Sequence, residues 1–153
     1  MESFKIKNFE RDNPGMAFPS WEPVEPDKCA SFKERIARQL GLPSTVDSLL
    51  LVRRLNEVAS NSKNTGFDRS SHDLLRILQG LKIGPPLIVY INWYRFDNID
   101  KIAFVDLCRN LEDIWYPGTD DIDIFDDTLD WVLTINHEGA IQSVTWSKAN
   151  GKQ

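Results

Sequence analysis

The sequence predicts an α+β fold, in which N-terminal helices pack on an antiparallel sheet of about four to five strands. Three observations lead to this prediction. Apolar residues recur at helical spacing in the N-terminal half. A Gly-Pro-Pro break at 84–86 ends that half. Beyond it, short runs with strand alternation are separated by tight turns. At 153 residues the chain can bury a sizeable core, and we expect 1–153 to form a single domain.

The first element is an extended arm. Residues 1–27 hold four prolines, and prolines at that spacing exclude a long helix. They are Pro14, Pro19, Pro23 and Pro26. We therefore expect a proline-rich extended segment, from which Phe18 and Trp21 pack on the core.

Residues 28–82 form the predicted helical part. In the first helix, apolar residues recur every four positions from Phe32 to Leu40, which places them on one face. The second helix begins at a cap provided by Ser44 or Thr45. A polar loop and a third, shorter helix complete this part before the Gly-Pro-Pro break.

Residues 86–146 are predicted to be mainly sheet with one helix. The run LIVYINWY is rich in β-branched and aromatic residues and nearly continuous in apolarity, which predicts a strand buried on both faces. Ile102 and Val105 stand at helical spacing with the residues that follow them. This spacing predicts a helix over roughly 99–110.

Three short strands follow in the last third of the chain. In DDIDIFDD, Ile122 and Ile124 face one side of the predicted sheet, and Asp121 and Asp123 face the other. LDWVLTINH and AIQSVTW form the next two strands, joined by the tight turn HEG. Strands connected this closely pair antiparallel.

Charge is distributed unevenly along the chain. The net charge is −5, from 18 basic and 23 acidic residues, yet no Lys or Arg lies between Arg109 and Lys148. The acidic residues of that span are Glu112, Asp113, Asp120, Asp121, Asp123, Asp126, Asp127, Asp130 and Glu138. The rest of the chain therefore has 18 basic and 14 acidic residues, a net of +4. An acidic C-terminal third repels nucleic acid and attracts basic partners.

The composition also limits the cellular setting. No window approaches the apolar length of a membrane span, and the N-terminus lacks the apolar core of a secretory signal. Cys29 and Cys108 lie far apart and do not form a disulfide framework, which fits a reducing compartment. We therefore expect a cytoplasmic protein that binds neither membrane nor nucleic acid.

The sequence has no strong catalytic or metal-binding motif. Asp121 and Asp123 form a D-x-D pair of the kind that some metal-dependent hydrolases use, but the segment does not match a calcium-binding loop. It lacks a nucleophile elbow and a phosphate-binding glycine loop. We therefore expect no catalytic residue, no metal and no cofactor, and keep a metal-dependent hydrolase built on the D-x-D pair as an alternative.

The acidic segment is better explained as a binding surface. Closely spaced carboxylates repel one another and must stay hydrated to remain charged, which describes an exposed face rather than a catalytic pocket. Trp115 and Tyr116, next to the Pro-Gly turn, are suited to anchor a basic protein. The predicted partner-binding residues are Glu112, Asp113, Trp115, Tyr116, Asp120, Asp121, Asp123, Asp126, Asp127 and Asp130. A merely solvated acidic face is the plainer alternative, and a surface that mimics nucleic acid is another.

The segment DIWYPGTDDIDIFDDTLDWVLTINHEG resembles the C-terminal part of bacterial immunity proteins of contact-dependent growth inhibition and related polymorphic toxin systems. The shared features are the WYP turn, the DD before an alternating strand, IFD, the Trp of the next strand and the HEG turn. They begin at Trp115, Asp120, Ile124, Trp131 and His137. The resemblance covers only the C-terminal part of the chain, from about Trp93 onward.

This resemblance implies a cytoplasmic inhibitor that binds one cognate toxin and occludes its active site. Many such toxins are nucleases with basic clefts, and their inhibitors often present acidic surfaces. Because immunity proteins use different surfaces, the resemblance transfers no binding residue. The expected partner is thus a cognate protein toxin, and the expected function is toxin neutralisation without catalysis.

Overall fold

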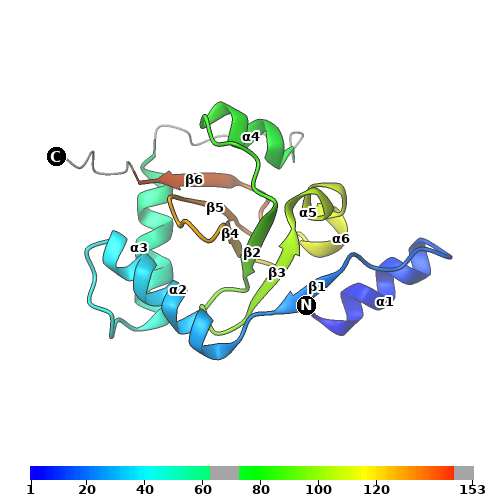
Figure 1. Cartoon of the computed structure of the whole chain (residues 1–153), viewed down its shortest axis with the longest axis horizontal. Coiled ribbons are helices and arrows are strands. Elements are labelled where there is room, and N and C mark those ends of the chain that lie inside the picture. Colours follow the sequence, from blue (N-terminus) through cyan, green and yellow to red (C-terminus); the bar gives the residue numbers. More distant parts are fainter. Residues whose placement is uncertain (63–72, 147–153) are drawn as a thin grey trace.

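The structure is a computed structural model that describes residues 1–62 and 73–146. Within these residues the chain forms six helices and one six-stranded sheet, so the predicted α+β class is confirmed with six strands rather than four to five (Figure 1). The strands are β1 Trp21–Pro23, β2 Ile88–Asn92, β3 Ile99–Ala103, β4 Ile122–Phe125, β5 Trp131–Ile135 and β6 Ile141–Thr145. The helices are α1 Ser3–Asp12, α2 Pro26–Gln39, α3 Ser48–Ser60, α4 Leu74–Gly80, α5 Phe104–Arg109 and α6 Leu111–Ile114.

The sheet is antiparallel throughout, with the order β1-β3-β2-β4-β5-β6. β4, β5 and β6 form a meander with short connections, as the sequence predicts. β2 and β3 form a hairpin that the sequence does not predict. The two parts meet where β2 pairs with β4, with Ile91 opposite Ile124. Helices α5 and α6 carry the chain from β3 to β4.

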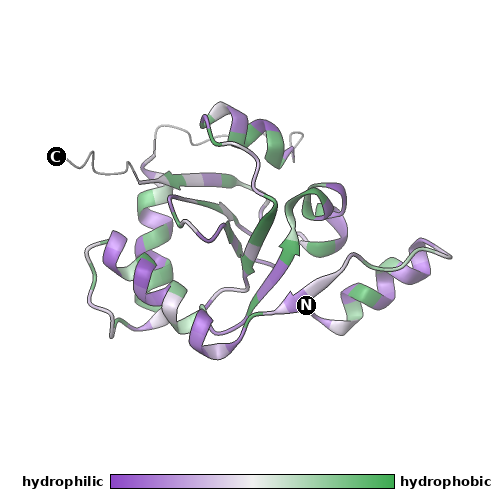
Figure 2. Cartoon of the chain, viewed as in Figure 1, coloured by the Kyte–Doolittle hydropathy of each residue, from purple (hydrophilic) through white to green (hydrophobic). Residues whose placement is uncertain are grey.

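Helices cover both faces of the sheet. One core cluster joins α4, α5 and α6 to inward residues of the sheet such as Ile91 and Leu133. The other joins α2 and α3 to residues of the opposite face such as Phe125 and Val132. Neighbouring residues of a strand point to opposite faces, so the central strands are buried on both sides. Figure 2 shows β2 as hydrophobic along most of its length, whereas α2 and α3 alternate between hydrophilic and hydrophobic residues.

The prediction that 1–27 is extended is wrong for residues 3–12, which form helix α1. The prolines do not prevent this helix, because all four follow it in sequence and Pro14 comes directly after its C-cap, Asn13. Phe9 is buried and contacts Phe18 edge to face, with ring centroids 5.4 Å apart. The segment after α1 matches the prediction, since Trp21 begins strand β1 and packs against the core.

The prediction of a helix over 99–110 is also wrong for its first half. Residues 99–103 form strand β3, and α5 begins only at Phe104. β3 pairs with β1 on one side and with β2 on the other, and Ile99 and Ile102 enter opposite core clusters. Burial on both faces hides the strand period and leaves an accidental helical spacing.

The helical part follows the prediction in α2, α3 and α4, although residues 63–72, with most of the predicted polar loop, lie outside the described residues. Asp47, rather than Ser44 or Thr45, caps α3, and its carboxylate accepts from the amides of Leu49 and Leu50. Among the described helices, none has the length and apolar character that crossing a membrane requires.

Candidate functional site

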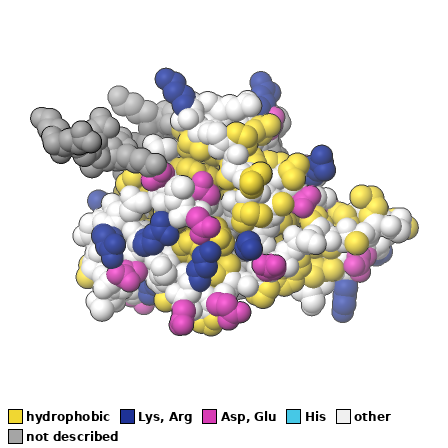
Figure 3. Space-filling view, in the orientation of Figure 1, with side chains coloured by type: hydrophobic (Ala, Val, Ile, Leu, Met, Phe, Trp, Pro, Cys, Tyr) yellow, Lys and Arg dark blue, Asp and Glu magenta, His cyan; other side chains and the backbone are white. Residues whose placement is uncertain are grey.

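The structure divides the aspartates of residues 120–130 between the two ends of β4. Asp120 and Asp121 precede the strand, and Asp126, Asp127 and Asp130 follow it. At about 3.3 Å per residue, the two groups stand roughly 16 Å apart along the strand. Figure 3 shows Asp and Glu side chains interspersed with Lys and Arg on the face it presents. The aspartates therefore do not form one continuous acidic band.

Asp120 forms an ion pair with Lys5 of α1, whose side chain is fully buried. Nζ of Lys5 also donates to the carbonyl of Ile114 at 2.7 Å. It lies 4.4 Å from the ring centroid of Trp93 and 4.8 Å from that of Tyr116. Two aromatic faces and a carboxylate replace the water that this ammonium group loses.

The aspartates that follow β4 stabilise the turn into β5. Asp126 accepts from the amide of Thr128 at 2.9 Å and from the indole N–H of Trp131 at 3.1 Å. Asp127 lies 3.2 Å from Nζ of Lys28 and accepts from the hydroxyl of Tyr90 at 3.0 Å. Asp130 is half-buried. This group thus has structural roles within the fold.

Asp123 lies between the two groups and is buried, so the expectation of an exposed carboxylate is wrong at this position. Asn92 of β2 donates to its Oδ2 at 2.8 Å. Burial raises the pKa of Asp123 to about 7, the bond from Asn92 opposes the rise and the charge of Asp121 adds to it. The side chain of Asp123 points to the same face of the sheet as that of Phe125. Helices α2 and α3 cover this face, which removes Asp123 from solvent.

The expectation that Trp115 is an exposed anchor is wrong as well. Its side chain belongs to the core at 5% exposure, and its indole N–H donates to the carbonyl of Asp120 at 2.9 Å. Tyr116 is only half-buried, but its ring contacts Lys5 and meets Phe4 edge to face at 5.7 Å. Trp115 therefore binds the turn before β4, and Tyr116 packs between that turn and α1.

The last two predicted residues, Glu112 and Asp113, lie on α6, where Glu112 is exposed. Partial burial raises the pKa of Asp113, and the charges of Glu112 and Asp12 raise it further. These two carboxylates form a third, separate group. The fold compensates part of the acidic segment, because Lys5 and Lys28 each pair with one of its aspartates.

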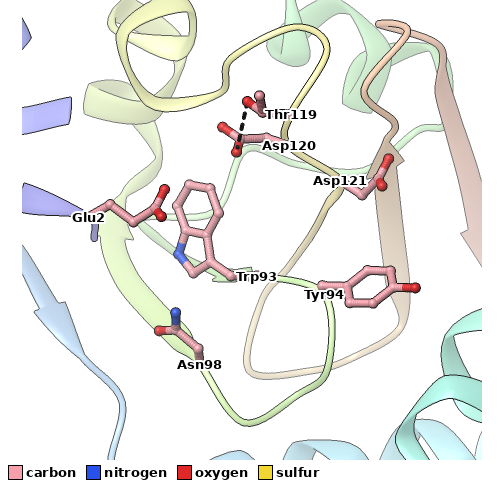
Figure 4. Close-up of a pocket in the computed structure, with 7 residues that line it drawn as sticks. All are labelled: Glu2, Trp93, Tyr94, Asn98, Thr119, Asp120 and Asp121. Carbon is pink, nitrogen blue, oxygen red and sulfur yellow. Dashed lines mark hydrogen bonds between the residues drawn. The ribbon is translucent and has the colours of Figure 1, made fainter. Parts of the chain in front are cut away.

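One concave surface nevertheless combines exposed acid with an exposed aromatic ring. A cavity of about 430 Å³, which we call the Tyr94 cleft, lies where the loop after β2 meets the start of α1 and the turn before β4. Its lining residues are Glu2, Trp93, Tyr94, Asn98, Thr119, Asp120 and Asp121. Figure 4 shows the Trp93 ring between Glu2 and Asp120, with Tyr94 directed away from Trp93.

A second cavity of about 360 Å³ adjoins the cleft and shares Tyr94 and Asp121 with it. It is bordered by α3, which contributes Arg53, and by the β5–β6 turn, which contributes His137. Oδ1 of Asp121 accepts from the backbone amide of His137 at 2.8 Å and lies 3.0 Å from Nδ1 of its ring. Asp121 thus stands at the centre of a hollow built from four separate segments.

The loop that carries Tyr94 is held in an unusual conformation. Tyr94 has a φ of 86° and Phe96 a φ of 61°, in the left-handed region that non-glycine residues rarely adopt. Oδ1 of Asn92 accepts from the amide of Phe96 at 2.8 Å, while its Nδ2 donates to Asp123. Tyr94 remains 41% exposed. The loop backbone is therefore held by Asn92, and it presents the solvent-facing ring of Tyr94 on the same cavity lining as Asp121.

Of the residues that line the cleft, the sequence predicts only Asp120 and Asp121 as partner-binding residues. It assigns Trp93 and Tyr94 to a buried strand. The polar residues that alternate with the aromatics in NWYRFDN were the available signal that a loop begins there. Glu2 could not be found, because nothing local indicates that the start of α1 packs beside the turn before β4.

The metal-ligating and thiol side chains of the described residues bear on the enzyme alternative. Among them, no group of three or more His, Cys, Asp or Glu side chains could hold a metal ion. Both cysteines are free, and burial raises the pKa of Cys108 to about 11 and also raises that of Cys29. High pKa values disfavour the thiolate that a nucleophilic cysteine needs.

The fold and the site together define an α+β protein with helices on both faces of an antiparallel sheet and an acidic, aromatic hollow at one end of it. Comparison of the chain with protein-family models, with curated proteins and with solved structures gives no match.

Proposed function

We propose that this chain is a non-catalytic binding protein that neutralises a cognate, basic protein toxin by covering it with the surface around the Tyr94 cleft. The observation that carries the proposal is the cleft itself. It places Glu2 and Asp121, whose side chains are 54% and 43% exposed, on one concave surface with the exposed ring of Tyr94. Exposed aromatic rings ringed by charge are typical of protein interfaces.

The electrostatics favour a basic partner. Three carboxylates line the Tyr94 cleft, and among the described residues Lys5 is the one lysine paired with them: it pairs with Asp120 and lies 3.7 Å from the carboxylate of Glu2. Uncompensated surface charge steers an oppositely charged protein and accelerates association by orders of magnitude. A nuclease with a basic cleft is a toxin of the required charge. The resemblance of the C-terminal part to immunity proteins points to the same kind of partner, which would be met in the cytoplasm.

The two alternatives receive less support. A hydrolase that uses the D-x-D pair needs two accessible carboxylates, but Asp123 is buried and bonded to Asn92. A mimic of nucleic acid needs a regular row of exposed charge. In the described residues this row is interrupted by buried Asp123 and by the ion pairs of Asp120 and Asp127.

Co-expression tests the proposed function. The partner to be tested is a toxin domain at the variable C-terminus of a large secreted protein, sought in the gene immediately upstream of this chain. We expect that this domain arrests growth when expressed alone, that co-expression of the full chain restores growth, and that the two proteins co-purify as a stable complex. Growth arrest that persists in the presence of the well-expressed chain would refute the proposal for that toxin.

A further inference from the structure

We infer that the Tyr94 cleft receives an arginine side chain of the partner protein. This inference rests on the proposed function, which supplies a basic protein, and it goes further by naming the recognised side chain. The Lys5 site provides the first observation, because it shows that the wall of the cleft already binds a cation.

Lys5 reaches this wall from inside the protein. Its Nζ is paired with Asp120, lies 3.7 Å from the carboxylate of Glu2 and stands 4.4 Å from the ring centroid of Trp93. The same three residues line the Tyr94 cleft. A second cation that entered from solvent would therefore meet the same aromatic and carboxylate chemistry.

The carboxylates of the cleft differ in how many of their oxygens already have a hydrogen bond or an ion pair within the protein. Oδ2 of Asp120 is occupied by Lys5 and by the amide of Tyr116 at 2.8 Å. Asp121 receives both of its contacts, from His137, at Oδ1. Among the described residues, Oδ2 of Asp121 has no hydrogen-bond partner. The carboxylate of Glu2 pairs there with Lys5 alone, at 3.7 Å. Asp121 and Glu2 are thus the groups that remain for a partner.

The shape of the cleft favours arginine over lysine. A guanidinium is planar, stacks on aromatic faces and donates two parallel bonds to a carboxylate, whereas an ammonium is compact and strongly hydrated. Trp93 and Tyr94 supply rings, and the indole N–H of Trp93 is fixed by a 2.8 Å bond to Asp100. The chain's own cations already use these rings in this way, since Cζ of Arg95 lies 5.7 Å from the ring centroid of Tyr94 and Nζ of Lys5 lies 4.4 Å from that of Trp93. Neither of these cations lines the Tyr94 cleft, and Arg53 borders only the adjoining cavity.

Nuclear magnetic resonance titration of the full chain tests this inference. The probes are N-acetyl-arginine amide, the matching lysine amide and the neutral citrulline amide. We expect saturable shifts of the Trp93 indole N–H and the Tyr94 amide with the arginine probe, at a dissociation constant in the millimolar range. The lysine probe should bind about tenfold more weakly. The indole N–H of Trp131, at the other end of β4, serves as the internal control.

Variants locate the bound probe. Asp121→Asn and Tyr94→Ala should each weaken arginine binding at least about fivefold, and the matched exposed variant Glu34→Gln on α2 should leave it unchanged. The inference is overturned if the arginine probe gives no saturable shift, or if the citrulline probe binds equally well. Either result would leave the proposed function standing as long as the chain still neutralises its toxin, since co-expression does not depend on which side chain enters the cleft.

Discussion

Lys5 is fully buried, which is rare for a lysine and needs a full set of compensating contacts. Its ammonium group has them in Asp120, the carbonyl of Ile114 and the rings of Trp93 and Tyr116. A buried ion pair is weak evidence of net stabilisation, but loss of one partner leaves the other charge buried without a counter-charge, which is strongly destabilising. Lys5 therefore acts as the attachment point of α1.

The first prediction concerns this attachment. Lys5→Met should lower the free energy of unfolding by about 3 kcal/mol, because Asp120 would lose its buried counter-charge. Lys7→Met on the exposed face of the same helix is the matched control and should change stability by less than about 0.5 kcal/mol. Urea denaturation of the three proteins provides the measurement. Equal midpoints for Lys5→Met and Lys7→Met would show that the ion pair does not stabilise the fold.

Asp123 gives a second prediction at this scale. Its pKa is raised from 3.8 to about 7, so the folded chain holds this proton more tightly than the unfolded chain. Its contribution to stability is therefore full below about pH 4 and is lost as the pH rises to about 7. Asp123→Asn keeps an acceptor for Asn92 and removes the titration.

We expect the stability of Asp123→Asn relative to wild type to increase by about 3 kcal/mol between pH 5 and pH 8. Chemical denaturation at several pH values checks this, with Glu34→Gln on the exposed face of α2 as the control. Parallel pH profiles for wild type and Asp123→Asn would contradict the raised pKa.

Among the elements, those with one dominant period were predictable. The helical repeat that begins at Phe32 corresponds to α2, and the alternation in LDWVLTINH corresponds to β5. β3 was not predictable, because it is buried on both faces and its pairing with β1 and β2 decides its conformation. α1 escaped prediction because its buried face carries Lys5, which a hydrophobic pattern does not register.

The turn before β4 supports a prediction about this element. Gly118 has a φ of 83°, and its amide donates to the carbonyl of His137 at 2.7 Å, which ties this turn to the β5–β6 turn. Apart from Gly118 itself and its two chain neighbours, no described residue places a heavy atom within 4 Å of an added Cβ, so any cost arises from the backbone conformation. Gly118→Ala should therefore destabilise the protein by about 1 kcal/mol.

Gly80→Ala is the matched control. Gly80 is the last residue of α4, also has open space around an added Cβ and has no positive φ. The alanine should stabilise the helix by up to about 1 kcal/mol. Thermal unfolding of both variants checks the pair. If the two substitutions shift the midpoint in the same direction, the backbone conformation of Gly118 is not what the fold requires.

At the scale of the whole molecule, the sequence predicts the acidic character of the C-terminal third, but it does not predict which residues pair with these aspartates. The N-terminal helix supplies Lys5 to Asp120, and α2 supplies Lys28 to Asp127, and both contacts join residues far apart in the chain. No local pattern contains that information. The fold thereby divides a broad acidic segment into separate groups, and the group around Asp121 gains Glu2 from the start of α1.

The association rate with the toxin domain, measured by stopped flow over a range of salt concentrations, tests this surface most directly. The account predicts that Glu2→Lys combined with Asp121→Lys slows association at least about tenfold and reduces its salt dependence. The exposed charge reversal Glu34→Lys should leave the rate within about twofold of wild type. Association that is equally fast and equally salt-dependent in the double variant would contradict the account, because the partner would then bind elsewhere.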